Sequence, residues 1–194
     1  GGASECSMAQ WGSGDLEQAL GLPKVLGDLL GVACFSVALG MGRSLFAKIG
    51  KYPSRAILMG AVGAAACYLI ASLSPFAVIG LLGCAFTGFC VSMLWPGTLI
   101  LMEEKFPNPG VTAYALMAAG GDMGASVAPQ MVGILSDKFS LTDLALRISE
   151  VFHISAEQVG MRAGLLAAGF FPIAGVVCVL CMKKHLKNKA KSRY

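Results

Sequence analysis

The feature that most constrains this chain is a run of 47 residues, 56–102, without a charged side chain. A helix needs about 20 apolar residues to cross the hydrocarbon core of a bilayer, so the run is long enough for two crossings. Ser74 and Pro75 lie near its middle, and proline disfavours helical backbone in the residue before it. We therefore predict two membrane spans, 56–71 and 76–102, joined by a turn at residues 72–75.

The rest of the sequence predicts further spans. Charged residues make up only 13% of the chain and the mean hydropathy is +0.70, a balance unlike that of soluble domains. Three more apolar stretches lie at 24–46, 111–136 and 163–182. Residues 1–11 are too short to cross a bilayer, so we expect the sequence to start inside a transmembrane helix that something preceded. The prediction is all-α: one polytopic membrane helical bundle over residues 1–194, with about five full transmembrane helices and a truncated first one.

The Lys and Arg residues are unevenly divided between the two sides that these spans define. Of the 15, 11 lie in the loops at 43–55 and 103–110 or in the tail after residue 182, which all face one side. Because positive residues concentrate on the cytoplasmic side, we expect a multi-pass protein of the plasma (inner) membrane with a cytoplasmic C-terminus. The basic tail directly follows an apolar 20-mer. It therefore indicates orientation in a membrane rather than nucleic-acid binding, and no nucleic-acid partner is expected.

The Cys and His residues do not have the spacing of a metal, cofactor or catalytic site. All seven Cys residues fall in apolar stretches, and Cys178 and Cys181 form a CxxC within the last span. Zinc sites and disulfide frameworks need Cys residues on loops that converge, so buried thiols that pack as small hydrophobic groups are the better interpretation. His153 and His185 lie outside the spans. We expect no metal, no cofactor and no enzymatic activity.

The longest loop, between the fifth and sixth spans, predicts a surface helix. Apolar residues recur there every three to four positions, which is the spacing of an amphipathic helix. They are Leu141, Leu144, Ile148, Val151 and Phe152. The polar stretch that begins at Ser155 predicts a helix cap and a first turn leading into the sixth span.

Two acidic residues lie inside apolar segments. Asp122 is near the middle of span 111–136, and Glu5 is in the partial first span. A charge inside a bilayer costs at least about 2.5 kcal/mol unless it faces a cavity or a partner, so both are candidates for binding a coupling proton or a polar solute. The alternative is a protonated or hydrogen-bonded acid that packs helices. Weaker polar or aromatic candidates are Gln10, Trp11, Tyr114 and Gln130.

Trp95 and Pro96 allow two interpretations. Pro96 frees a backbone carbonyl and kinks its helix, and broken helices line the cavities of transporters. Trp95 would then stack on the face of a sugar and donate its indole N–H to a hydroxyl group. Alternatively, Trp95 is an aromatic side chain that faces lipid or another helix.

The loop between spans 24–46 and 56–71 contains both glycines and cations. Its distinctive residues are Gly40, Gly42, Arg43, Gly50 and Arg55. The first two glycines allow helices to approach closely. The spacing resembles the cytoplasmic loop between the second and third helices of each half in the major facilitator superfamily (MFS).

Three other stretches strengthen that resemblance. Residues 4–11 resemble the second half of the family's seventh helix, residues 92–107 its tenth helix and exit, and residues 120–137 its eleventh helix and exit. Nearly the whole chain is therefore similar to the C-terminal six-helix half of an MFS transporter, with a leaning toward the sugar-permease-like branch around the fucose symporters. The resemblance implies that the loop residues above, together with Asp137, take part in conformational change.

The implied function is secondary active transport of a small polar solute, such as a sugar, by alternating access between two six-helix bundles. The resemblance implies coupling to a proton. The expected partners are membrane lipid, the solute, the proton and the N-terminal six-helix half of the same transporter. A non-transporting membrane scaffold or sensor is the alternative, and an intramembrane enzyme is less favoured because no Ser and His pair lies within the spans.

Overall fold

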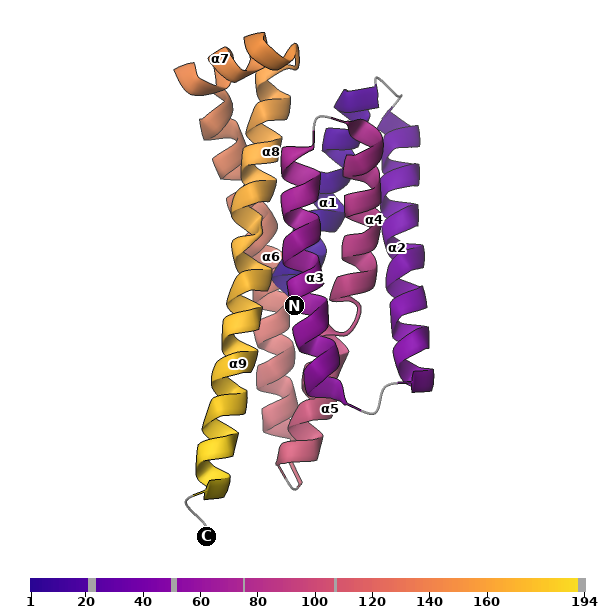
Figure 1. Cartoon of the computed structure of the whole chain (residues 1–194), viewed down its shortest axis with the longest axis vertical. Coiled ribbons are helices and arrows are strands. Elements are labelled where there is room, and N and C mark those ends of the chain that lie inside the picture. Colours follow the sequence, from indigo (N-terminus) through magenta and orange to yellow (C-terminus); the bar gives the residue numbers. More distant parts are fainter. Residues whose placement is uncertain (21–23, 50–51, 75, 107, 192–194) are drawn as a thin grey trace.

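The computed structural model describes residues 1–20, 24–49, 52–74, 76–106 and 108–191. Within these ranges the chain forms helices and no strand, which confirms the all-α prediction. Most of the helices lie side by side along one long axis (Figure 1). The helices are α1 (Gly2–Leu20), α2 (Lys24–Ile49), α3 (Pro53–Leu73), α4 (Ala77–Val91), α5 (Leu94–Lys105), α6 (Val111–Ser140), α7 (Asp143–Phe152), α8 (Ala156–Ala168) and α9 (Phe170–Lys191).

Among the described residues, three segments are long and apolar enough to cross a membrane. They are Pro53–Leu73, Val78–Lys105 and Ala156–His185. The first two occupy the uncharged run, and the third contains the predicted last span. The predicted spans 24–46 and 111–136 are found as α2 and α6. Their crossing of a membrane remains a prediction.

The turn inside the uncharged run follows from the predicted proline effect. Ser74 ends α3 with extended backbone, φ −70° and ψ 128°, as expected for a residue that precedes proline. The next helix, α4, begins at Ala77. Pro75 itself lies outside the described residues, but the helices end and begin on either side of it as predicted.

Two of the predicted spans are divided into two helices each. The segment 76–102 breaks between α4 and α5 at Ser92 and Met93, and 163–182 breaks between α8 and α9 at Gly169. Each break lies three to four residues before a proline, Pro96 or Pro172. Proline has no N–H to donate to the carbonyl four residues earlier, so the helical hydrogen-bond ladder is interrupted at those points.

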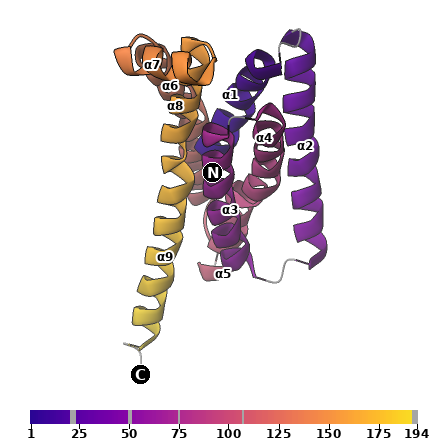
Figure 2. The ribbon, with the colours of Figure 1, turned by 45° about the horizontal axis from the view of Figure 1, so that its top comes forward.

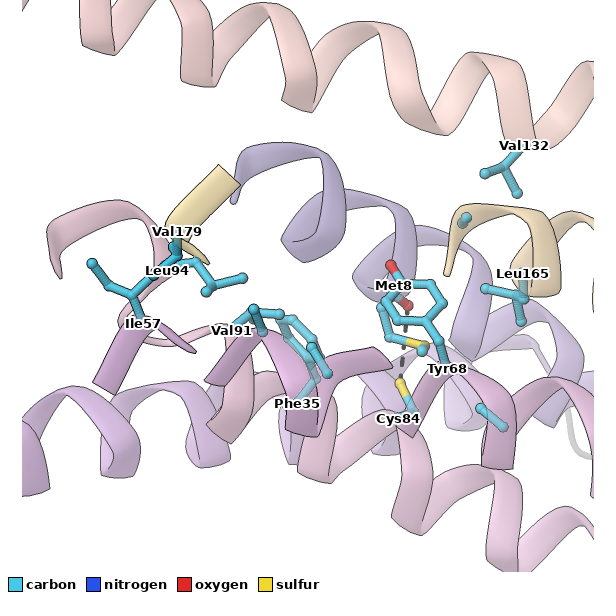
Figure 3. Packing of buried hydrophobic residues seen from close by; sticks show 14 of the residues in the cluster. Met8, Phe35, Ile57, Tyr68, Cys84, Val91, Leu94, Val132, Leu165 and Val179 are labelled. Carbon is cyan, nitrogen blue, oxygen red and sulfur yellow. Dashed lines mark hydrogen bonds between the residues drawn. The ribbon is translucent and has the colours of Figure 1, made fainter. Parts of the chain in front are cut away.

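The central helix is α1, which packs against α2, α4, α6 and α8. The sequence predicted a partial span ending near residue 11, followed by a polar stretch, whereas the helix continues to Leu20. Ser4 and Met8 of α1 are fully buried. The buried Tyr68 hydroxyl of α3 donates a 2.7 Å hydrogen bond to the Ser4 carbonyl. Figure 3 shows the Tyr68 ring beside Met8, whose carbonyl accepts from the Cys84 thiol.

Small residues bring the helix backbones close together. A Cβ atom on Gly88 of α4 would overlap the backbone carbonyl of Phe35 on α2. A Cβ on Gly160 of α8 would likewise overlap the carbonyl of Ser136 on α6. Helices that associate in lipid gain van der Waals contact from such close approach, because lipid tails provide no hydrophobic driving force between them.

The predicted surface helix is α7, which lies across one end of the bundle (Figures 1 and 2). The Thr142 side chain caps its first turn, and Ser155 caps α8 as the sequence predicted. The apolar residues Leu144, Val151 and Phe152 are exposed. An amphipathic helix with an uncovered apolar face suits the interface of a bilayer.

The ends of the bundle give the first testable prediction. The α7 end and the C-terminal end of α9 lie at opposite ends of the long axis (Figure 1), and most cations lie at the C-terminal end. A reporter fused after Arg193 should therefore be cytoplasmic, and one inserted at Thr142 should be external. Accessibility of each reporter to a membrane-impermeant reagent checks this, and the reverse pattern contradicts the span assignment.

Candidate functional site

A polar junction connects three helices of the bundle. The Glu5 carboxylate of α1 forms an ion pair with the Arg43 guanidinium of α2, with Oε1 and Nη2 3.5 Å apart. The Glu5 side chain is 25% exposed and that of Arg43 is 45% exposed. The pair is therefore neither fully buried nor freely solvated.

The same arginine contacts the break between α4 and α5. Arg43 Nε donates a long hydrogen bond of 3.4 Å to the Ser92 carbonyl oxygen. Ser92 is four residues before Pro96, so its carbonyl is the acceptor that the proline leaves without a helical partner. The freed carbonyl predicted from Pro96 is confirmed, and α2 supplies the group that bonds to it.

The predicted conformational loop is only partly a loop. Gly40, Gly42 and Arg43 all lie within α2, which continues to Ile49. Gly42 is a point of close approach because a Cβ there would overlap the Ser92 side chain. Gly40 has no neighbouring atom within 4 Å of a Cβ position, so the predicted close approach at that glycine is wrong.

The other predicted loop residues are dispersed. The Arg55 guanidinium lies 4.9 Å from the centre of the Tyr52 ring, at the start of α3. Gly50 lies outside the described residues. Asp137 is near the end of α6 that leads into α7, at the opposite end of the bundle from the segment between α2 and α3 (Figure 1). Grouping Asp137 with that loop was therefore wrong.

Asp122 lies beside a crossing of three helices. Its neighbour Gly121 on α6 faces the Trp95 indole of α5, since a Cβ there would lie 2.6 Å from Trp95 Nε1. Gly2 at the start of α1 meets the Gly121 carbonyl at the same place. The Asp122 side chain is exposed. Among the described residues, no Lys or Arg forms an ion pair with it.

The two acids belong to one region of the bundle. Glu5 is three residues beyond Gly2 on α1, which is less than one helical turn, or about 4.5 Å of rise. Asp122 directly follows the Gly121 that Gly2 meets on α6. The arrangement therefore combines two carboxylates, an arginine and an indole near one helix crossing. Their carboxylate oxygens can accept hydrogen bonds, and the guanidinium and indole N–H groups can donate them.

The weaker candidates have different positions. The Trp11 indole N–H donates a 3.0 Å hydrogen bond to the Pro129 carbonyl of α6, so in this structure it joins two helices and is not free to bind a solute. Gln10 and Gln130 are exposed, and Tyr114 is half-buried. Of the candidates predicted from sequence, the structure brings Glu5 together with Arg43, and it places Trp95 against Gly121, the residue before Asp122.

The thiols are less uniformly buried than the sequence predicted. Cys67 and Cys84 are buried, whereas Cys178 and Cys181 on α9 are exposed. Exposure within the single chain corrects the expectation that all seven pack inside the protein. Among the residues that the structure describes, no three His, Cys, Asp or Glu side chains are placed to hold a metal ion together.

Comparisons of the chain with protein-family models, with curated proteins and with solved structures found no significant match. The chain is an all-helical protein with three segments apolar enough to cross a membrane, and it carries ionisable groups at a helix crossing.

Proposed function

We propose that the chain is one six-helix half of an MFS-type secondary active transporter, which moves a small polar solute together with a proton by alternating access. The observation that carries this proposal is the exposed carboxylate of Asp122 near the middle of α6. The residue before it, Gly121, is where the Trp95 indole and the start of α1 meet α6. Intramembrane carboxylates mark proton and substrate pathways because lipid does not solvate them.

The exposure of this region supports a second bundle. Asp122 and Gln130 on α6 and Gln10 on α1 are all exposed. In lipid, an unpaired carboxylate at this depth costs at least about 2.5 kcal/mol. A water-filled cavity closed by another bundle removes that cost, as in transporters whose sites lie between two halves. The other six-helix half of the same transporter is the partner that we infer.

The polar junction supplies a means of coupling. A proton on Glu5 removes the charge that holds Arg43, and Arg43 is also the donor to the Ser92 carbonyl at the helix break. Protonation of Glu5 would therefore weaken the positioning of Arg43, whose hydrogen bond to the Ser92 carbonyl lies at the break between α4 and α5. A group whose protonation is tied to one of two backbone arrangements couples proton binding to movement.

A non-transporting membrane scaffold or sensor is the second candidate. The uncovered apolar faces of α6, with Leu116, Met123 and Met131 all exposed, would suit a helical partner. The carboxylate between them favours transport, because a packing surface in lipid has no need of an acid. An intramembrane enzyme is not favoured by any arrangement of the described side chains.

Solute-driven proton movement tests the proposal. The chain is expressed in membrane vesicles together with the partner six-helix half that we infer, and the external pH is recorded as sugars, polyols and other polar solutes are added. We expect one solute class to alkalinise the medium as solute and proton enter together. Vesicles with the 194-residue chain alone should show no such signal. Transport by the purified chain as a monomer contradicts the half-transporter proposal, and a silent complete protein favours the scaffold.

A further inference from the structure

A groove next to the polar junction lies between α2 and α3, over α4, and it shares Ser92 with that junction. Its cavity volume is about 520 Å³, within the range of small-molecule sites. The groove is lined mainly by apolar side chains, among them Leu45 and Phe46 of α2, Met59 of α3 and Phe89 of α4. Leu45 and Met59 are 47% and 74% exposed, so the groove opens sideways from the bundle rather than into its core.

The groove begins at the end of the bundle that carries most of the cations. Tyr52 and Arg55 lie at its mouth, where α3 starts, and Gly60 lies at its inner end. Tyr52 and Gly60 are eight positions apart, which corresponds to about 12 Å of helix rise. That length matches the distance from the headgroup level of a leaflet well into its hydrocarbon region.

The mouth of the groove is positively charged. Arg55 and Lys48 are exposed, and within the described part of the chain neither forms an ion pair with a carboxylate. The Arg55 guanidinium instead rests over the Tyr52 ring at 4.9 Å. An arginine and a tyrosine at a helix start are the residue types that meet phospholipid headgroups.

We propose that this groove binds an anionic phospholipid, with the lipid phosphate at Arg55 and one acyl chain along Leu45, Phe46 and Met59. The apolar lining and the lateral opening fit a chain that comes from the bilayer, and the unpaired guanidinium selects a negative headgroup. A zwitterionic lipid brings an ammonium group into the same positive mouth and binds more weakly. The inference rests on the membrane location within the proposed function, and it does not rest on transport.

Photo-cross-linking in vesicles tests the proposal. The full chain is reconstituted in phosphatidylcholine vesicles that contain a trace of phosphatidylglycerol or phosphatidylcholine with a diazirine on one acyl chain. Labelled residues are then located by peptide mass spectrometry. We expect groove residues to be labelled about fivefold more by phosphatidylglycerol, as one cation–headgroup contact provides. Arg55→Gln should bring that ratio close to one, and Arg55→Lys should retain most of it.

Two more variants separate the site from general effects. Ala56→Trp fills the groove and should reduce its labelling by both lipids. Arg147→Gln is the matched control, because it removes an exposed arginine of α7 at the other end of the bundle and should leave the ratio unchanged. Circular dichroism reports whether each variant keeps its helices.

Three outcomes overturn the proposal. They are equal labelling by the two lipids in the unmodified chain, a preference that survives Arg55→Gln, and release of the phosphatidylglycerol signal by inorganic phosphate. The last result assigns the mouth to a free phosphate instead of a lipid. A complete transporter that fails to move any solute leaves this measurement unaffected, so the two proposals fail separately.

Discussion

Asp122→Asn should lower solute-driven proton entry about 100-fold in vesicles that contain both six-helix halves, near the upper end of ordinary coupling free energies. Asparagine keeps the size of the side chain but cannot bind and release a proton. Because Asp122 is exposed in the single bundle, the substitution should leave the amount of folded protein unchanged. The pH change on solute addition measures coupling, and a radiolabelled solute measures entry by itself.

The matched control is Asp143→Asn, which changes an exposed acid in the first turn of α7. It should retain proton entry at the parental rate. Asp122→Glu should recover part of the activity, since it restores the carboxylate at a slightly different position. Parental proton entry in Asp122→Asn, with its pH dependence intact, reduces Asp122 to a packing residue.

Tyr68→Ala should have the largest effect on stability, lowering the free energy of unfolding by about 3–5 kcal/mol, as for other large buried aromatic residues. Tyr68 is fully buried beside Met8 (Figure 3). Tyr68→Phe keeps the ring and removes only the hydrogen bond to the Ser4 carbonyl, so it should cost about 1 kcal/mol. Unfolding in mixed micelles of mild and denaturing detergent gives both values.

Phe86→Ala is the control for this pair of variants. Phe86 lies on α4 with 62% of its surface exposed, so its loss opens no cavity inside the bundle and should change stability by less than about 1 kcal/mol. Equal losses for Tyr68→Ala and Phe86→Ala would mean that α1 and α3 are not packed together around Met8.

Hydropathy was sufficient to locate most of the helices but not to divide them. The uncharged run predicted two spans, and α3 together with the segment Val78–Lys105 occupies it. The two breaks depend on which hydrogen bond a proline removes. Pro96 predicted a kink and a freed carbonyl, and both are found at Ser92. The corresponding effect of Pro172 was not predicted, although the same rule applies to it.

The sequence predicted some residues of the candidate site but not how they pair. Glu5 was predicted as an ionisable residue in an apolar segment, but its partner Arg43 is 38 positions away and was assigned to a loop. No local pattern pairs the two, because their distance depends on how α1 packs against α2. Asp137 shows the same limitation in reverse. It was grouped with Arg43 by resemblance, but it lies near the end of α6 that leads into α7, whereas Arg43 contacts Glu5 and Ser92.

The break between α4 and α5 has a mechanical consequence. An unbroken helix resists bending through its continuous ladder of hydrogen bonds. Between α4 and α5 the helical hydrogen bond to the Ser92 carbonyl is missing. α4 packs on α1, α2 and α3, whereas α5 packs chiefly on α3. The break at Ser92 therefore acts as a hinge between α4 and α5, and the Arg43 hydrogen bond to Ser92 restrains it. Tilting at this hinge would move α5 while α4 stays packed against α1, α2 and α3.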